Sequence, residues 1–277
     1  MQVEPITFNG IDAIRLAREG ASAVVALHGA QVVSWVAADG RERLFVGERA
    51  KFDGVAAIRG GVPVIFPQFG ERGTLPKHGF ARTLSWRFHG AQEDEAIFEL
   101  RNDAATAHWP HAFVARLRVG LSATRLTLAL QVENTGEAAF AFTAALHTYL
   151  RVDDISGVAL EGLQGCDYED SLAGGTLRRE NEWEVRFDGA TLEEGIDRIY
   201  NDVVAPLLLR DGARELPVEQ EGFPDAVVWN PGDHLATRIA DLAPDEWRRF
   251  VCVEAGVVLQ PEVLAPGESW EGVQILG

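Results

Sequence analysis

The sequence predicts an all-β fold, a sandwich of antiparallel strands with few short helices. Wherever hydrophobic periodicity is clear, its period is two residues, which is typical of strands with one buried face. Short apolar runs separated by Gly, Pro, Asn or Asp recur along the chain with no helical pattern between them, which favours antiparallel pairing. A length of 277 residues suits one large sandwich, so we expect a single domain over residues 1–277.

The clearest strand is FVARLRVGL, residues 113–121, in which apolar side chains alternate with Arg116 and Arg118. RLTLALQVEN, residues 125–134, follows after a gap of a few residues and alternates in the same way. A connection this short predicts that the two strands are antiparallel neighbours.

Other apolar runs predict strands at residues 22–27, 31–36, 96–100, 142–152, 225–230, 250–258 and 272–276. One helical signal stands out. Pro244 suits a first helical turn, and the acidic residues that follow it suit the positive end of a helix dipole. We therefore expect a short connecting helix there and a two-layer sandwich elsewhere.

The charge balance excludes some classes of partner. With 25 Lys and Arg against 42 Asp and Glu, the net charge is −17, which disfavours binding to nucleic acid or to a membrane surface. The first residues lack the basic and apolar regions of a signal peptide, and no apolar run reaches the roughly 18 residues of a membrane span. Cys166 and Cys252 form no CxxC pair, so we expect reduced thiols in a cytoplasmic protein.

Two polar residues lie within apolar strands. His147, in LHTYLRV, is either a core histidine or a catalyst. Glu254, in FVCVEAG, lies two residues after Cys252 and shares its face of the predicted strand with apolar groups. An ionised carboxylate buried there without a partner costs several kcal/mol. Desolvation should raise its pKa toward that of a base working near neutrality, although pairing with an arginine is the structural alternative.

A loop rich in Gly and Pro follows Arg59, in RGGVPVIFPQFG. The glycines would let the backbone approach a ligand closely, and the guanidinium suits phosphate or sugar oxygens. Asp197, in GIDRIYND, could simply cap a turn. Nucleotide-binding and serine-hydrolase motifs are absent, and no His, Cys, Asp and Glu set has metal-ligand spacing, so we predict no metal site.

Seven blocks in order resemble the hexose-6-phosphate mutarotases, the glucose-6-phosphate 1-epimerase branch of the aldose 1-epimerase superfamily. They are IRGGVPVIFPQFG, LPKHGFAR, LHTYLRV, IDRIY, DAVVWNPG, VCVEAG and LAPGESWEGVQIL, spanning residues 58–276. The resemblance implies a galactose-mutarotase-like β-supersandwich. It also implies an isomerase that interconverts the α and β anomers of hexose 6-phosphates, above all D-glucose 6-phosphate, as a monomer without a cofactor.

The resemblance assigns substrate-binding roles to residues of these blocks. Arg59 and Arg82 would bind the sugar phosphate and supply the local positive charge that an acidic chain needs. Asp197 would bind a sugar hydroxyl. His78 would face the ligand in a supporting role. Lys77, which stands where some members have glutamine, would favour the binding of phosphate through its positive charge.

The resemblance makes His147 the general acid, protonated or readily so, and Glu254 the general base. Two positions depart from the family pattern: Leu150 stands where an aromatic residue is common and Ala255 where proline is common. Two other functions stay open. A non-catalytic sugar-binding module would lack the acid or the base, whereas a glycosidase or polysaccharide lyase could use Glu254 with Asp197.

Overall fold

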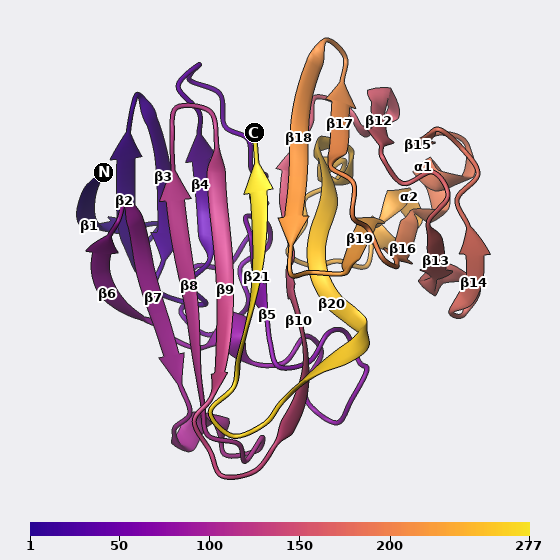
Figure 1. Ribbon diagram of the computed structural model, residues 1–277. Coiled ribbons are helices and arrows are strands. Elements are labelled where there is room, and N and C mark those ends of the chain that lie inside the picture. The colour runs from indigo at the N-terminus through magenta and orange to yellow at the C-terminus, as the bar shows by residue number, and fades with distance from the viewer.

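The computed structural model describes all 277 residues and contains three antiparallel sheets (Figure 1). Nine strands form one layer, in the order β15 (Glu184–Arg186), β12 (Val158–Glu161), β17 (Leu207–Asp211), β18 (Arg214–Glu221), β21 (Ser269–Leu276), β9 (Leu126–Asn134), β8 (Phe113–Leu121), β7 (Glu95–Arg101) and β6 (Arg87–Gln92). The pairing of β8 with β9 runs from Phe113 opposite Asn134 to Leu121 opposite Leu126, as the sequence predicted.

Two sheets make up the other layer. The smaller has four strands in sequence order, β1 (Gln2–Phe8), β2 (Ile11–Arg18), β3 (Ala21–Ala26) and β4 (Val32–Val36), and contacts β8. The larger has eight: β14 (Thr176–Arg179), β13 (Asp167–Asp170), β16 (Ile196–Tyr200), β19 (Asp225–Asn230), β20 (Phe250–Leu264), β10 (Phe140–Leu146) and β5 (Val64–Ile65), with β11 (Tyr149–Arg151) also on β20. The predicted all-β sandwich is therefore confirmed.

Helices are few and short. The α-helices are α1 (Ala190–Glu194) and α2 (Gly232–Ala236), and the helix expected after Pro244 is a 3₁₀ turn at Glu246–Arg249. The Glu246 carboxylate accepts hydrogen bonds from the backbone N–H groups of Glu48 and Ala243, which ties this turn to a distant loop. None of the helices has the length and apolar character that a membrane crossing requires.

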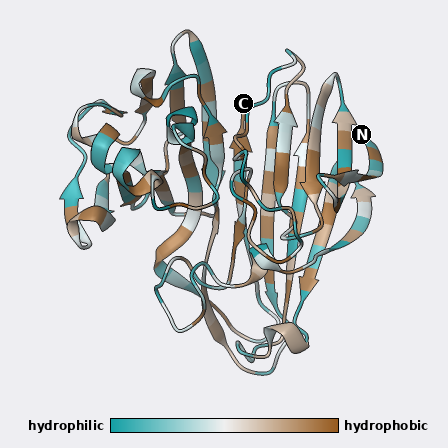
Figure 2. Ribbon diagram, turned by 180° about the vertical axis from the view of Figure 1, so that it is seen from behind, coloured by the Kyte–Doolittle hydropathy of each residue, from teal (hydrophilic) through white to brown (hydrophobic).

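A core cluster of 62 buried residues joins the two layers. Apolar and polar bands alternate along the strands in Figure 2, which is the period of two seen in the sequence. The sequence missed several strands in the region from β12 to β18, because many are short and lack a clean alternation. All four residues of β14, for example, are exposed.

One break in the eight-stranded sheet determines where the chemistry can occur. Leu146 lies opposite Ala255 and Tyr149 lies opposite Cys252, so the register is the same on both sides of the break between β10 and β11. His147, the first residue of the break, is therefore opposite Glu254. Its own backbone N–H donates to the carbonyl of Pro63 instead, at 3.0 Å.

Behind this break, a buried glutamine of β21 connects the two layers. The Thr148 hydroxyl donates to Oε1 of Gln274 at 2.5 Å, and Nε2 of Gln274 donates to the carbonyl of Val253 at 3.0 Å. The backbone N–H of Val253 in turn donates to the carbonyl of Thr148 at 3.1 Å. We call these contacts the Gln274 bridge. It fixes the residue after His147 to the residue before Glu254.

Replacing Gln274 with leucine should lower the free energy of unfolding by about 1–3 kcal/mol, because the buried Thr148 hydroxyl and Val253 carbonyl lose a partner. Urea titration would measure the change. Gln92→Leu, on the exposed edge of β6, is the matched control and should stay within about 0.5 kcal/mol of the wild type. Equal unfolding midpoints for the two variants would show that the Gln274 bridge adds nothing to stability.

Candidate active site

A pocket of about 430 Å³ opens on the eight-stranded sheet. The register places Ile199 beside Val227 and Val227 beside Glu254 on one face, and all three line the pocket. Thr148 and Val253 point to the opposite face, toward the nine-stranded sheet. All seven residues singled out in the sequence also line this pocket: Arg59, Lys77, His78, Arg82, His147, Asp197 and Glu254.

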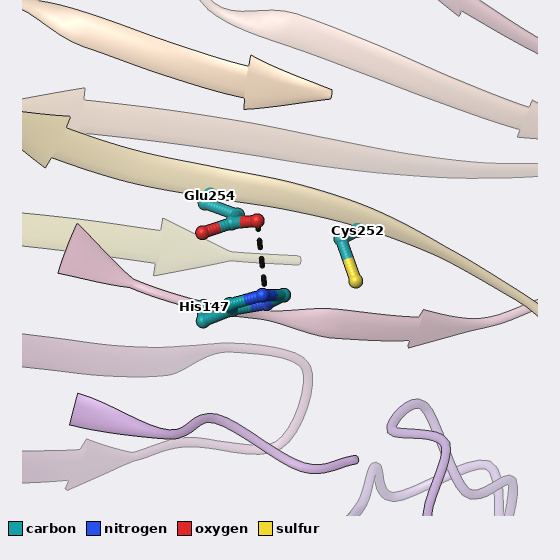
Figure 3. A group of neighbouring side chains, drawn as sticks. All are labelled: His147, Cys252 and Glu254. Atoms are coloured by element: carbon teal, nitrogen blue, oxygen red, sulfur yellow. Dashed lines mark ion pairs between the residues drawn. The ribbon is translucent and has the colours of Figure 1, made fainter. Parts of the chain in front are cut away.

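His147 and Glu254 meet at the centre of the site (Figure 3). Nδ1 of His147 lies 3.3 Å from Oε1 of Glu254, and the glutamate side chain is 1% exposed. The contact lacks the geometry of a hydrogen bond, since His147 Nδ1 has no hydrogen-bond partner, and the other carboxylate oxygen, Oε2 of Glu254, has none either. The alternative of a glutamate paired with an arginine does not hold, because the ion-pair partner of Glu254 is His147.

Burial changes the proton affinity of both residues. It raises the pKa of the Glu254 carboxyl well above its ordinary value, and the charge of Asp197 adds to the rise. It lowers the pKa of the His147 imidazole, as do the positive charges of Arg82 and Arg59. Burial therefore favours a proton on Glu254 and disfavours one on His147, and the two groups titrate as a coupled pair. The expected rise at Glu254 is present, whereas a readily protonated His147 is not favoured by these side chains alone.

His78 packs against the pair as a neutral group. Its ring lies edge-on to that of His147, with centroids 5.6 Å apart, and burial lowers its pKa to about 3. Its Nδ1 accepts a hydrogen bond from the backbone N–H of Gly70 at 3.3 Å, which leaves the proton on Nε2. His78 has a φ of +67°, an uncommon conformation for a histidine and one that recurs at functional sites.

The two arginines have different surroundings. Arg59 is already paired: Nε and Nη2 each lie 3.1 Å from Oδ1 of Asp241, and Nη1 donates to the Tyr149 hydroxyl at 2.9 Å. Arg82 has no carboxylate within ion-pair distance, and its one hydrogen bond is from Nη2 to the carbonyl of Lys77, at 2.9 Å. Its buried Nε has no partner, and burial lowers its pKa. Arg82 is therefore the arginine with unused capacity for an anion.

Sequence reasoning missed Tyr149 and Asp241. The Tyr149 ring stacks on His147, with centroids 4.9 Å apart and an interplanar angle of 9°, so it connects the histidine to Arg59. Tyr149 follows His147 by two residues, a spacing that places both on one face of a strand and could have identified it. Asp241 lies in a loop with no such signal.

Two glycines near the site, Gly60 in the loop after Arg59 and Gly79 in the LPKHGFAR block, have positive φ and lie against backbone atoms. Gly60 has a φ of +104°, and a Cβ there would lie 2.2 Å from the carbonyl oxygen of Phe45. Gly79, with a φ of +65°, would place a Cβ 2.3 Å from the carbonyl oxygen of Phe66. Gly60 and Gly79 allow their loops to pack on the protein's own backbone, whereas Gly70, also in the loop after Arg59, lines the pocket with no atom within 4 Å of where a Cβ would lie. Close approach of this loop to a ligand at Gly70 therefore stays a prediction.

Asp197 lies within β16, opposite Trp229, and not at a turn. Burial raises the pKa of its carboxyl. The next residue, Arg198, forms an ion pair, because Nη1 lies 3.0 Å from a carboxylate oxygen of Glu180, and its guanidinium covers the Tyr168 ring. Lys77 lines the pocket and forms no ion pair.

Comparison with known proteins places this site in a family. The aldose 1-epimerase family model matches residues 12–277. A Cenchrus ciliaris protein provisionally named glucose-6-phosphate 1-epimerase is 36% identical over 267 residues, covering 90% of this chain and 79% of that protein. An Escherichia coli protein with the same provisional name is 35% identical over 269 residues, covering 91% and 87%.

The fold has a close counterpart among solved structures. A crystal structure of a provisionally named mutarotase from Salmonella typhimurium superposes with a TM-score of 0.88 and 28% identity, covering 99% of this chain and 92% of that one. A galactose mutarotase-like protein from Lactobacillus casei, at 18% identity and a TM-score of 0.75, shares the fold. The antiparallel supersandwich, the family match over residues 12–277 and these relatives together show that the chain belongs to the aldose 1-epimerase family.

Proposed function

We propose that the protein interconverts the α and β anomers of a hexose 6-phosphate, with D-glucose 6-phosphate as its substrate. The observation that carries the proposal is that His147 and Glu254 meet at 3.3 Å in a pocket that also contains an unpaired arginine, Arg82. The provisional names of the relatives from Cenchrus ciliaris and Escherichia coli favour the same sugar phosphate.

Catalysis would consist of proton transfers within the pair. Glu254 takes the proton of the anomeric hydroxyl while protonated His147 gives its proton to the ring oxygen, and the C1–O5 bond breaks to give the open-chain aldehyde. Rotation about C1–C2 presents the other face of the carbonyl. The ring then closes as Glu254 returns a proton to the carbonyl oxygen and His147 takes the proton from the attacking hydroxyl.

This cycle leaves one proton on the pair at every stage. With the sugar closed, His147 carries it, and with the sugar open, Glu254 carries it. Burial favours the second arrangement, because it raises the pKa of Glu254 and lowers that of His147. The site therefore stabilises the proton distribution that accompanies ring opening, which is the difficult half of the reaction.

A phosphate group would supply the opposing influence. The positive charges of Arg82 and Arg59 contribute to the low pKa of His147. A phosphate dianion bound at Arg82 would offset that charge and favour protonated His147, which the closed sugar requires. Lys77, also without an ion-pair partner, is a second candidate contact for the phosphate.

The alternatives explain the site less well. A binding module needs neither a base nor an acid, yet both lie in contact here. A glycosidase would use two carboxylates on either side of a glycosidic bond, whereas Glu254 faces a histidine. We further propose that the enzyme acts as a monomer in the cytoplasm, where the free thiols of Cys166 and Cys252 would stay reduced.

Glu254→Gln and His147→Ala should each lower kcat by about a hundredfold or more, the usual contribution of a positioned acid or base. Exchange of the anomers of glucose 6-phosphate, followed by NMR, measures this. Circular dichroism and the urea midpoint would establish that each variant is folded. Wild-type turnover in folded Glu254→Gln would make Glu254 a structural carboxylate.

Arg82→Ala should lower kcat/KM for glucose 6-phosphate about 10- to 100-fold, since charge-assisted hydrogen bonds contribute roughly 1.5–3 kcal/mol. The loss on free glucose should be much smaller, because that sugar offers no phosphate. Arg82→Lys should recover part of the loss, since lysine keeps the charge but lacks the planar fork.

Arg59→Ala is the matched comparison. Because Arg59 also holds Tyr149 against His147, its loss should reduce activity on both sugars. Equal losses on glucose and glucose 6-phosphate in Arg82→Ala would contradict a phosphate-binding role for Arg82.

A further inference from the structure

The mechanism leaves one potential metal-ligating side chain beside the pair unused. Cys252 lies two residues before Glu254 on β20, so both project to the same face, and the two face His147 in Figure 3. One nitrogen, one sulfur and one oxygen, from His147, Cys252 and Glu254, all lie within 4.8 Å of one another. The three residues are 8%, 0% and 1% exposed.

We propose that His147, Cys252 and Glu254 form an inhibitory site for a thiophilic divalent cation such as Zn²⁺ or Cd²⁺. That the ion would bind follows from the three donors, whereas its inhibitory effect rests on the proposed function. Sequence spacing gave no indication of this site, because His147 precedes Cys252 by about a hundred residues and meets it only through the pairing of the strands.

The donor set matches the chemistry of zinc. Zinc sites that keep an open position commonly use three protein ligands of the nitrogen, sulfur and oxygen types, with water as the fourth. Ligands at 2.0–2.3 Å from one ion require these donors to move closer together by about 1 Å. Magnesium and calcium prefer oxygen ligands and would gain little from the thiol or the imidazole.

The site also has unused bonding capacity. Nδ1 of His147 and Oε2 of Glu254 are buried without a hydrogen-bond partner, which is unfavourable and which a cation would relieve. Binding would release two protons, one from the Cys252 thiol and one from the His147 and Glu254 pair, because thiolate, carboxylate and neutral imidazole are the ligand forms. Two negative ligands would then balance the charge of the ion.

An ion held there would stop the reaction proposed above. Coordination would use one oxygen of the Glu254 carboxylate and one ring nitrogen of His147, and the charge of the ion would lower the proton affinity of both groups. Neither group could then accept a proton from the sugar. The metal would thus act on the acid and the base themselves, without competing for the phosphate contacts at Arg82.

Cobalt tests the site without relying on activity. Co²⁺ bound by a thiolate shows charge-transfer absorption in the near ultraviolet, and we expect this band to saturate at one equivalent in the wild type. Cys252→Ser should abolish the band, with Cys252→Ala as a second variant in case serine disturbs the core. Cys166→Ser is the matched control, because it removes the other cysteine, and it should keep the band. No band in the wild type, or a band that survives in Cys252→Ser, would overturn the site.

The inhibitory effect needs a second measurement. Buffered Zn²⁺ should inhibit anomer exchange of glucose 6-phosphate by the wild type and by Cys166→Ser, EDTA should restore the rate, and Mg²⁺ should have no effect. Relative to its own zinc-free rate, Cys252→Ser should need about tenfold more Zn²⁺ or higher, since even the loss of a supporting contact weakens metal binding 10- to 100-fold.

These two measurements separate the hypotheses. A cobalt band in a protein with no anomer exchange would leave the metal site standing and disprove the proposed function. Equal zinc sensitivity of Cys252→Ser and the wild type would overturn inhibition at this triad.

Discussion

The antiparallel register of β20 against β10 and β11 is the constraint on which the site depends. The register is unchanged across the break between β10 and β11. His147 therefore places its side chain opposite Glu254, although its own backbone does not hydrogen-bond to β20. A shift of one residue would turn every side chain of β20 to the other face. The acid and the base would then lie on opposite sides of the sheet.

The buried polar groups on the two faces of this sheet differ in whether they have hydrogen-bond partners. Toward the nine-stranded layer, the Gln274 side chain hydrogen-bonds both the Thr148 hydroxyl and the Val253 carbonyl. Toward the pocket, Nδ1 of His147, Oε2 of Glu254 and Nε of Arg82 are buried without partners. Unsatisfied polar groups are unfavourable for stability. Three of the six such side-chain atoms in the protein lie in this one pocket, where the proposed reaction needs groups that can bind a ligand and exchange its protons.

The sequence was informative where one physical signal dominated. The strands at 113–121 and 126–134 were predictable because alternation is strict when one face is buried and the other wet. The short strands between β12 and β18 were not, since contacts with neighbours decide them more than local pattern does. The family resemblance identified the seven residues that line the pocket. The pairing of Arg59 with Asp241 and the approach of Cys252 to His147 could not be predicted, because they depend on contacts between segments distant in the sequence.

The alternation of side chains along β19 separates two kinds of requirement within a few residues. Ala226 and Val228 belong to the main core between the layers, whereas Val227 and Trp229 line the pocket. A substitution at Val227 would change the pocket wall and the separate cluster of six buried residues to which Val227 belongs, but not the main core. Substrate preference and folding can thus evolve along the same strand with little interference, which helps to explain how one scaffold could diversify among aldoses.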